Sequence, residues 1–143
     1  MPDCVFCQIA AEERDAHLVL DTLEVLAFLD HRPVFPGHTL VVPREHVATL
    51  LHLPSSRLPA YFSAVQRVTG AVTEAMGAQG TFVAMNNVVS QSVPHLHTHV
   101  VPRRKKDGLR GFFWPRTSYD SDEAMAEAAR AIHAALGPGP DGG

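Results

Sequence analysis

Three histidines in strict alternation constrain the fold of this chain more than any other feature. His95, His97 and His99 are two residues apart inside a run of apolar and β-branched residues. Residues two apart in an extended strand point to the same face, whereas a helix would distribute the three rings around its axis. We therefore predict a strand with all three imidazoles on one face. The opposite, core-facing side then consists of Leu96, Thr98 and Val100.

A face with three imidazoles needs an explanation, because histidine is only a modest strand former. One alternative is a surface strand that carries incidental histidines. The strict alternation, together with an opposite face that has the composition of a core, favours a face that binds a metal ion, a phosphate or both. The sequence alone leaves the choice among these ligands open.

The segment from His95 to Val101 resembles the signature of the histidine triad (HIT) family of nucleotide hydrolases and transferases. In that family, histidines alternate with apolar residues and two more apolar residues follow. The upstream pair Gln91 and Ser92 also resembles the family pattern. The resemblance covers residues 4 to about 115, and its parts occur in the family's order.

Length and charge limit the class of protein. A chain of 143 residues is predicted to form one domain over residues 1–136, followed by a disordered tail at 137–143 that is rich in glycine and proline. The net charge of −3 argues against general affinity for nucleic acid or anionic membranes. Neither a run of about 18 apolar residues nor a secretory signal is apparent. We therefore expect a cytoplasmic protein.

The two cysteines, Cys4 and Cys7, form a CxxC motif near the N-terminus. Two cysteines cannot build a disulfide framework, so the pair is a redox pair, half of a zinc site, or two reduced structural thiols. Redox pairs of the thioredoxin type follow a strand, and none is predicted before Cys4. One arm of a tetrahedral zinc site fits this position and needs two further ligands, which nine histidines make available.

The remaining chain predicts an α+β protein. Strands are expected at residues 18–21, 25–29, 39–42 and 81–85, with the histidine segment as the fifth. A long helix is expected over residues 57–76, with a short helix near residues 4–13 and a last helix that ends at Leu136. The buried stripe of the long helix is predicted to consist of Leu58, Phe62, Val65, Val68, Val72 and Met76, and that of the last helix of Met125, Ala129, Ile132 and Leu136. The resemblance implies a HIT-like fold with a mainly antiparallel five-stranded sheet.

The resemblance also implies roles for individual residues. His97 would be the nucleophile that attacks an α-phosphate, and His99 would contact the phosphate or protonate the leaving group. The substrate-binding residues implied in this way are Asp30, His38, Asn86, Gln91, Ser92 and Trp114. Two of these have alternatives, since Asp30 is equally suited to capping a turn and Trp114 to simple burial. The loop that joins the fourth and fifth strands has Val88 and Ser90 where glycine is common in the family, which leaves its phosphate-binding geometry open.

Zinc-bearing relatives imply a metal site as well. Mapped onto this chain, its ligands are Cys4, Cys7, His46 and His95. A Cys₂His₂ set fills the coordination sphere of zinc, so the ion would be structural.

The function that follows is hydrolysis or transfer of a purine nucleoside monophosphate group through a covalent nucleotidyl-histidine. The substrate class would be a dinucleoside polyphosphate, a nucleoside phosphoramidate or an acyl adenylate, and the family implies a homodimer. Two rival hypotheses are a non-catalytic, zinc-stabilised nucleotide-binding module and a CxxC oxidoreductase. The basic run from Arg103 to Lys106 is either a solvated loop or a patch that steers a polyphosphate toward the site.

Overall fold

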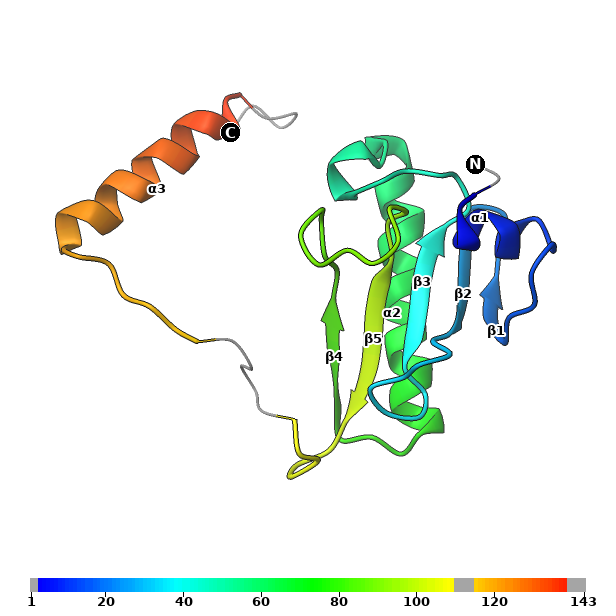
Figure 1. Ribbon diagram of the computed structural model, residues 1–143. Helices are drawn as coiled ribbons and strands as arrows, with labels where there is room; N and C mark the ends of the chain where they lie inside the picture. The colour runs from blue at the N-terminus through cyan, green and yellow to red at the C-terminus, as the bar shows by residue number, and fades with distance from the viewer. Residues whose placement is uncertain (1–2, 110–114, 139–143) are drawn as a thin grey trace. The chain divides into compact units, whose positions relative to one another are not determined.

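The computed structural model describes residues 3–109 and 115–138. The chain divides into two compact units, residues 1–107 and 108–143. In the first unit a five-stranded sheet is covered on one face by a long helix, α2 (Figure 1). The prediction of one domain over residues 1–136 stays a prediction, and the predicted tail lies mostly outside the described residues.

The sheet has the strand order β1-β2-β3-β5-β4, and every neighbouring pair is antiparallel. The strands are β1 Leu18–Asp21, β2 Val25–Leu29, β3 Thr39–Pro43, β4 Gly80–Ala84 and β5 Thr98–Arg103. All five agree closely with the predicted strands, which confirms the α+β class. The fifth strand begins later than expected, at Thr98, because Leu96 donates its backbone N–H to the Val47 carbonyl outside the sheet.

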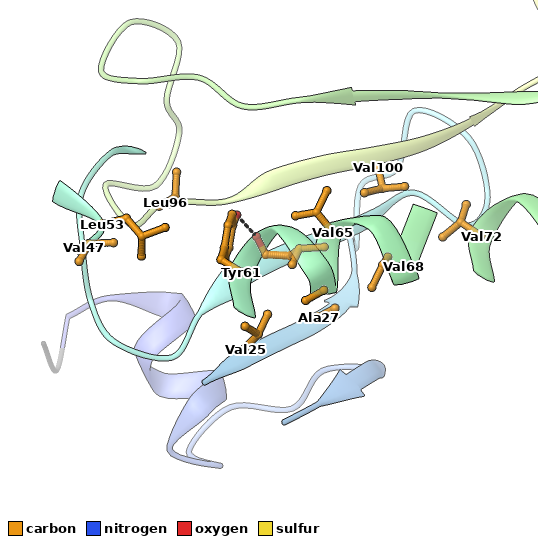
Figure 2. Packing of buried hydrophobic residues seen from close by; sticks show 12 residues of the cluster. Val25, Ala27, Val47, Leu53, Tyr61, Val65, Val68, Val72, Leu96 and Val100 are labelled. Carbon is orange, nitrogen blue, oxygen red and sulfur yellow. Dashed lines mark hydrogen bonds between the residues drawn. The ribbon is translucent and has the colours of Figure 1, made fainter. Parts of the chain in front are cut away.

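The helix α2 spans Leu58–Ala75 and packs against the sheet through Val65, Val68 and Val72, as predicted. Pro59 lies in its first turn, where the missing N–H has no partner to lose. Leu58 is partly buried against the same core, but two other members of the predicted stripe are not buried: Phe62 is 41% exposed and Met76 38% exposed. Tyr61 and Ala64 are buried instead, so the buried face is rotated toward them. Figure 2 shows Tyr61, Val65, Val68 and Val72 on the face of α2 that packs against the sheet.

The opposite face of the sheet holds a second apolar cluster. The short helix α1, Val5–Ala10, places Phe6 against this face, where it contacts Phe28 with ring centroids 5.3 Å apart. Other members of this cluster are Cys4, Leu26, Leu40 and Val42. The alternation of side chains along β5 therefore places Val100 in the core under α2, while the histidines lie on the α1 side.

The second unit contains α3, Asp122–Leu136. Ser121 begins this helix by accepting a hydrogen bond from the Ala124 N–H at 3.0 Å, and two acidic residues follow in the first turn. The predicted inner stripe is not buried, because Met125, Ile132 and Leu136 are 55%, 65% and 73% exposed. Two short 3₁₀ turns, Leu50–His52 and Ser55–Arg57, complete the described elements. None of the described helices has the length and apolar character that crossing a membrane requires.

Candidate active site and metal centre

Two cysteines and two histidines from distant parts of the chain meet beside α1. The Cys4 Sγ lies 3.4 Å from His95 Nδ1, and the Cys7 Sγ lies 3.3 Å from His46 Nδ1 and 3.6 Å from His95 Nδ1. The two histidine Nδ1 atoms are 3.2 Å apart. All four predicted metal ligands therefore present one donor atom each to a common point.

The donor set fits zinc in both spacing and protonation. At ordinary Zn–S and Zn–N bond lengths, a tetrahedral site has S···N edges of about 3.6 Å and N···N edges of about 3.3 Å. The distances given above agree with these values. The His95 Nε2–H donates to the Pro43 carbonyl at 2.8 Å, so the lone pair of its Nδ1 faces the cluster. The carbonyl of Pro43 thus supplies the outer hydrogen bond that fixes this tautomer.

Burial governs the protonation of this cluster in the absence of a cation. It lowers the pKa of His95 to about 4 and is also the main cause that raises the pKa of the Cys7 thiol, with Cys4 adding to it. A bound cation favours the thiolate, which counteracts this increase.

The middle histidine of the triad has a fixed tautomer. Its Nδ1–H donates to the backbone carbonyl of His95 at 2.8 Å, which leaves the lone pair on Nε2. The ring of Phe6 lies edge-on to the His97 ring, with centroids 5.1 Å apart, and His97 is only 2% exposed. The lone pair of the neutral imidazole therefore lies on Nε2, and the ring packs beside α1.

A second group joins Asp30, His38 and His99. The Val34 N–H donates to His38 Nδ1 at 3.0 Å, so His38 must carry its proton on Nε2. That Nε2–H donates to His99 Nδ1 at 2.9 Å, which in turn leaves a neutral His99 with its proton on Nε2. A protonated His99 Nε2 has no lone pair for a metal ion. The hydrogen bonds of this group instead fix which ring nitrogen of each histidine carries the proton.

Charge and burial keep this pair of histidines neutral. Burial, followed by the charges of His97 and His38, lowers the pKa of His99 to about 4. Burial likewise lowers the pKa of His38, while the nearby Asp30 carboxylate, 3.6 Å from its Nε2, opposes the shift. Asp30 also accepts the Arg32 N–H at 2.9 Å, which confirms the turn-capping alternative. Its contact with a ribose stays a prediction.

The loop between β4 and β5 is tied to the segment after β3. Gln91 accepts the Val88 N–H through Oε1 at 3.0 Å and donates from Nε2 to the Ala48 carbonyl at 2.6 Å. Asn87 accepts the Leu50 N–H at 2.9 Å. Gln91 is therefore a brace for this loop in the present structure, a role that the sequence analysis missed.

The other predicted binding residues of this loop are accessible. Asn86 is exposed and donates to the Ser90 carbonyl at 3.2 Å, and Ser92 is exposed as well. Their contacts with substrate stay predictions. Trp114 lies outside the described residues.

The two positions where glycine was expected have left-handed backbone conformations. Val88 has a φ of +73° and Ser90 a φ of +63°. A β-branched residue at positive φ is strained, and glycine is the residue that adopts this conformation without cost. The loop therefore retains a glycine-like backbone with residues that are poorly suited to it.

The basic run lies far from the histidines. Arg103 ends β5 opposite Gly80, about 20 Å along the chain from His97 at the rise of an extended strand. Its guanidinium donates to Asp107 at 2.6 and 3.1 Å, while Arg104 donates to the Met76 carbonyl at 2.9 Å. This position favours the interpretation of the run as a solvated loop.

Comparisons with known proteins agree with this geometry. A family model described as the HIT domain matches residues 11–106. The adenosine 5'-monophosphoramidase hnt1 of Schizosaccharomyces pombe is 31% identical over 125 residues, 86% of this chain and 91% of its own. A HIT-family structure from Bacillus subtilis superimposes with a TM-score of 0.87 at 30% identity, covering 96% of this chain and 99% of its own. A zinc-bound histidine triad protein from Mycobacterium smegmatis has a TM-score of 0.72 at 33% identity, covering 93% and 98%.

Proposed function

Because this chain belongs to the HIT family, we propose that it hydrolyses or transfers a nucleoside monophosphate group at the α-phosphate of a purine nucleotide. The proposal rests above all on His97, whose Nδ1–H is held by the His95 carbonyl so that Nε2 carries the lone pair. A neutral imidazole with a fixed tautomer is a competent nucleophile near neutral pH. We further propose that the active form is a homodimer.

The proposed reaction has two displacement steps. His97 Nε2 forms a bond to phosphorus while the bond from phosphorus to the leaving group breaks. The Nε2–H of His99 donates a hydrogen bond to the leaving atom, which takes its proton from solvent, so His99 keeps its own proton. Water then attacks the nucleotidyl-histidine and releases a proton to solvent as the N–P bond breaks. A hydrogen-bond donor placed in this way contributes about 10²–10³ to the rate. The hydrogen bond from His38 keeps the proton of His99 on the required nitrogen.

Substrate access requires a local movement. His97 is only 2% exposed and the Phe6 ring packs edge-on against it, so the surroundings of the ring have to open before a phosphate can approach Nε2. The metal proposed at the Cys₂His₂ cluster is structural, because four protein ligands leave no position for water. Cys4 and Cys7 flank Phe6, so their ligation would fix the position of α1 beside the triad.

Of the two main substrate classes, we favour the nucleoside phosphoramidates. A polyphosphate leaving group calls for nearby cations, whereas the basic run lies at the far end of β5. The similarity to a monophosphoramidase supports the same choice. The alternative function is a non-catalytic nucleotide-binding module, which the burial of His97 favours. A rapid-quench assay distinguishes this module from an enzyme.

The test compares the wild type with His97→Ala in rapid-quench assays on adenosine phosphoramidate and on diadenosine tetraphosphate. We expect a burst of product and an alkali-stable nucleotidyl adduct with the wild type, and a loss of at least about 10³-fold in turnover with His97→Ala. His17→Ala, which removes an exposed histidine, serves as the control and should retain full turnover. Tight nucleotide binding with no turnover by the wild type would establish the binding module instead.

A further inference from the structure

A buried pair of hydroxyl groups lies directly behind the triad, on the helix side of the sheet. The Tyr61 hydroxyl, from α2, lies 2.9 Å from the Val41 carbonyl and 2.6 Å from the Thr98 hydroxyl. A carbonyl can only accept, so Tyr61 donates to Val41 and Thr98 donates to Tyr61. Tyr61 is 1% exposed and Thr98 is fully buried, so water cannot replace either bond. Figure 2 shows the tyrosine reaching from α2 toward the sheet.

The position of this pair in the sheet connects it to the nucleophile. Thr98 opposes Val41 across the β3–β5 pair, so Tyr61 bonds to both members of one cross-strand pair. Thr98 also stands between His97 and His99 in the chain, with its side chain on the opposite face. A displacement of the backbone at Thr98 therefore moves both imidazoles.

The hydrogen bond of His97 itself does not fix the position of its ring relative to the core. Its Nδ1–H bonds to a carbonyl only two residues away, which orients the ring relative to its own segment. That segment precedes β5, since the ladder to β3 begins at Thr98. The bond from the Leu96 N–H to the Val47 carbonyl holds the backbone on one side of the nucleophile, and the contact from Tyr61 to Thr98 ties the other side to the core.

The hydroxyl pair matters more for the relative position of α2 and β5 than for the stability of the core. A buried hydrogen bond contributes little net stability, and replacing both partners by apolar groups of the same shape is nearly neutral. Phenylalanine and valine would therefore fill this space with similar stability. A hydrogen-bonded pair differs from such a contact because it allows one relative placement of α2 and β5 and opposes sliding between them.

We propose that Tyr61 is a positioning residue, which acts through Thr98 to place His97 Nε2 in line with the substrate phosphorus. This inference rests on the proposed function, because it assumes that His97 is the nucleophile. Misplacement of a reacting group by about 1 Å can reduce a rate about 10²-fold.

The experiment measures kcat and KM separately for Tyr61→Phe and Thr98→Val, with adenosine phosphoramidate as substrate. We expect kcat to fall about 10-fold to 100-fold while KM changes less than about twofold, because neither hydroxyl contacts the substrate. Thr98→Ser retains the hydroxyl and should recover most of the lost kcat. Thr69→Val is the matched control, since the Thr69 hydroxyl donates to the Val65 carbonyl within α2, at 2.7 Å.

The outcomes separate this inference from the function on which it rests. A wild type with no turnover that depends on His97 would refute the proposed function. A wild type with such turnover, together with kcat within twofold in both Tyr61→Phe and Thr98→Val, would overturn the positioning role. An equal loss of kcat in Thr69→Val, or a rise in KM parallel to the fall in kcat, would likewise overturn it by showing general loosening. Tyr61→Phe decides the matter if Thr98→Val does not fold, because it removes a single oxygen.

Discussion

The metal ion proposed at the Cys₂His₂ cluster is expected to stabilise the first unit strongly, so a chelator should destabilise it. A single ion held by Cys7, His46 and His95 closes loops of 39 and 49 residues. In the chain-entropy model, cross-linking a loop of this length stabilises the folded state by about 4 kcal/mol. Because the two loops share His46, the stabilisation from one loop alone is the minimum expected effect.

The corresponding shift in melting temperature is large enough to measure. A change of 1 kcal/mol shifts Tm by about 3 °C in a domain of this size, so chelation should lower Tm by about 12 °C. The assay combines elemental analysis of the dialysed protein with differential scanning calorimetry before and after exposure to a strong chelator. Re-addition of zinc should restore the original Tm, because binding to the folded state alone stabilises it.

Single substitutions locate the effect at the cluster. His46→Ala should lower both the zinc content and Tm, and chelator should then have little further effect. His17→Ala, at an exposed histidine outside the cluster, should behave as the wild type in all three measurements. A zinc content well below one per chain, or an unchanged Tm after chelation, would refute the reasoning.

Two further predictions concern stability. Since the pKa of His99 is about 4 in the folded state and about 6.5 when unfolded, its contribution is present above pH 6.5 and is lost as the pH falls toward 4. Urea unfolding should show a weaker dependence on pH for His99→Asn than for the wild type, and equal slopes would contradict the neutral pairing of His99 with His38. Asp30 and His97 are the other titratable groups that face His99. Val88→Gly should raise the free energy of unfolding by about 0.5–1 kcal/mol, because relief of a left-handed valine exceeds the entropy cost of glycine. Val89→Gly, at an equally exposed neighbour without positive φ, should lower it by a similar amount, and equal destabilisation by both would refute the strain.

The sequence alone determined the strands and the long helix, and the resemblance to the HIT family implied the two cysteines and two histidines that the structure brings together. Period-two and period-3.6 patterns encode the elements, because each has one buried face. The alternation from His95 to Val100 also placed the imidazoles opposite the core, as the structure has them. The rotation of the long helix was missed, since Phe62 is as apolar as Tyr61 and only packing decides which of them is buried.

What the tertiary structure decided is the protonation and placement of the histidines. The backbone groups of Val34, Pro43 and His95 fix the tautomers of three rings, and every residue carries such groups, so no residue type marks them in advance. The braces from Gln91 to Ala48 and from Tyr61 to Thr98 join residues 43 and 37 positions apart. Contacts of that range exist only after the chain has folded, because local sequence patterns specify each element but not its partner.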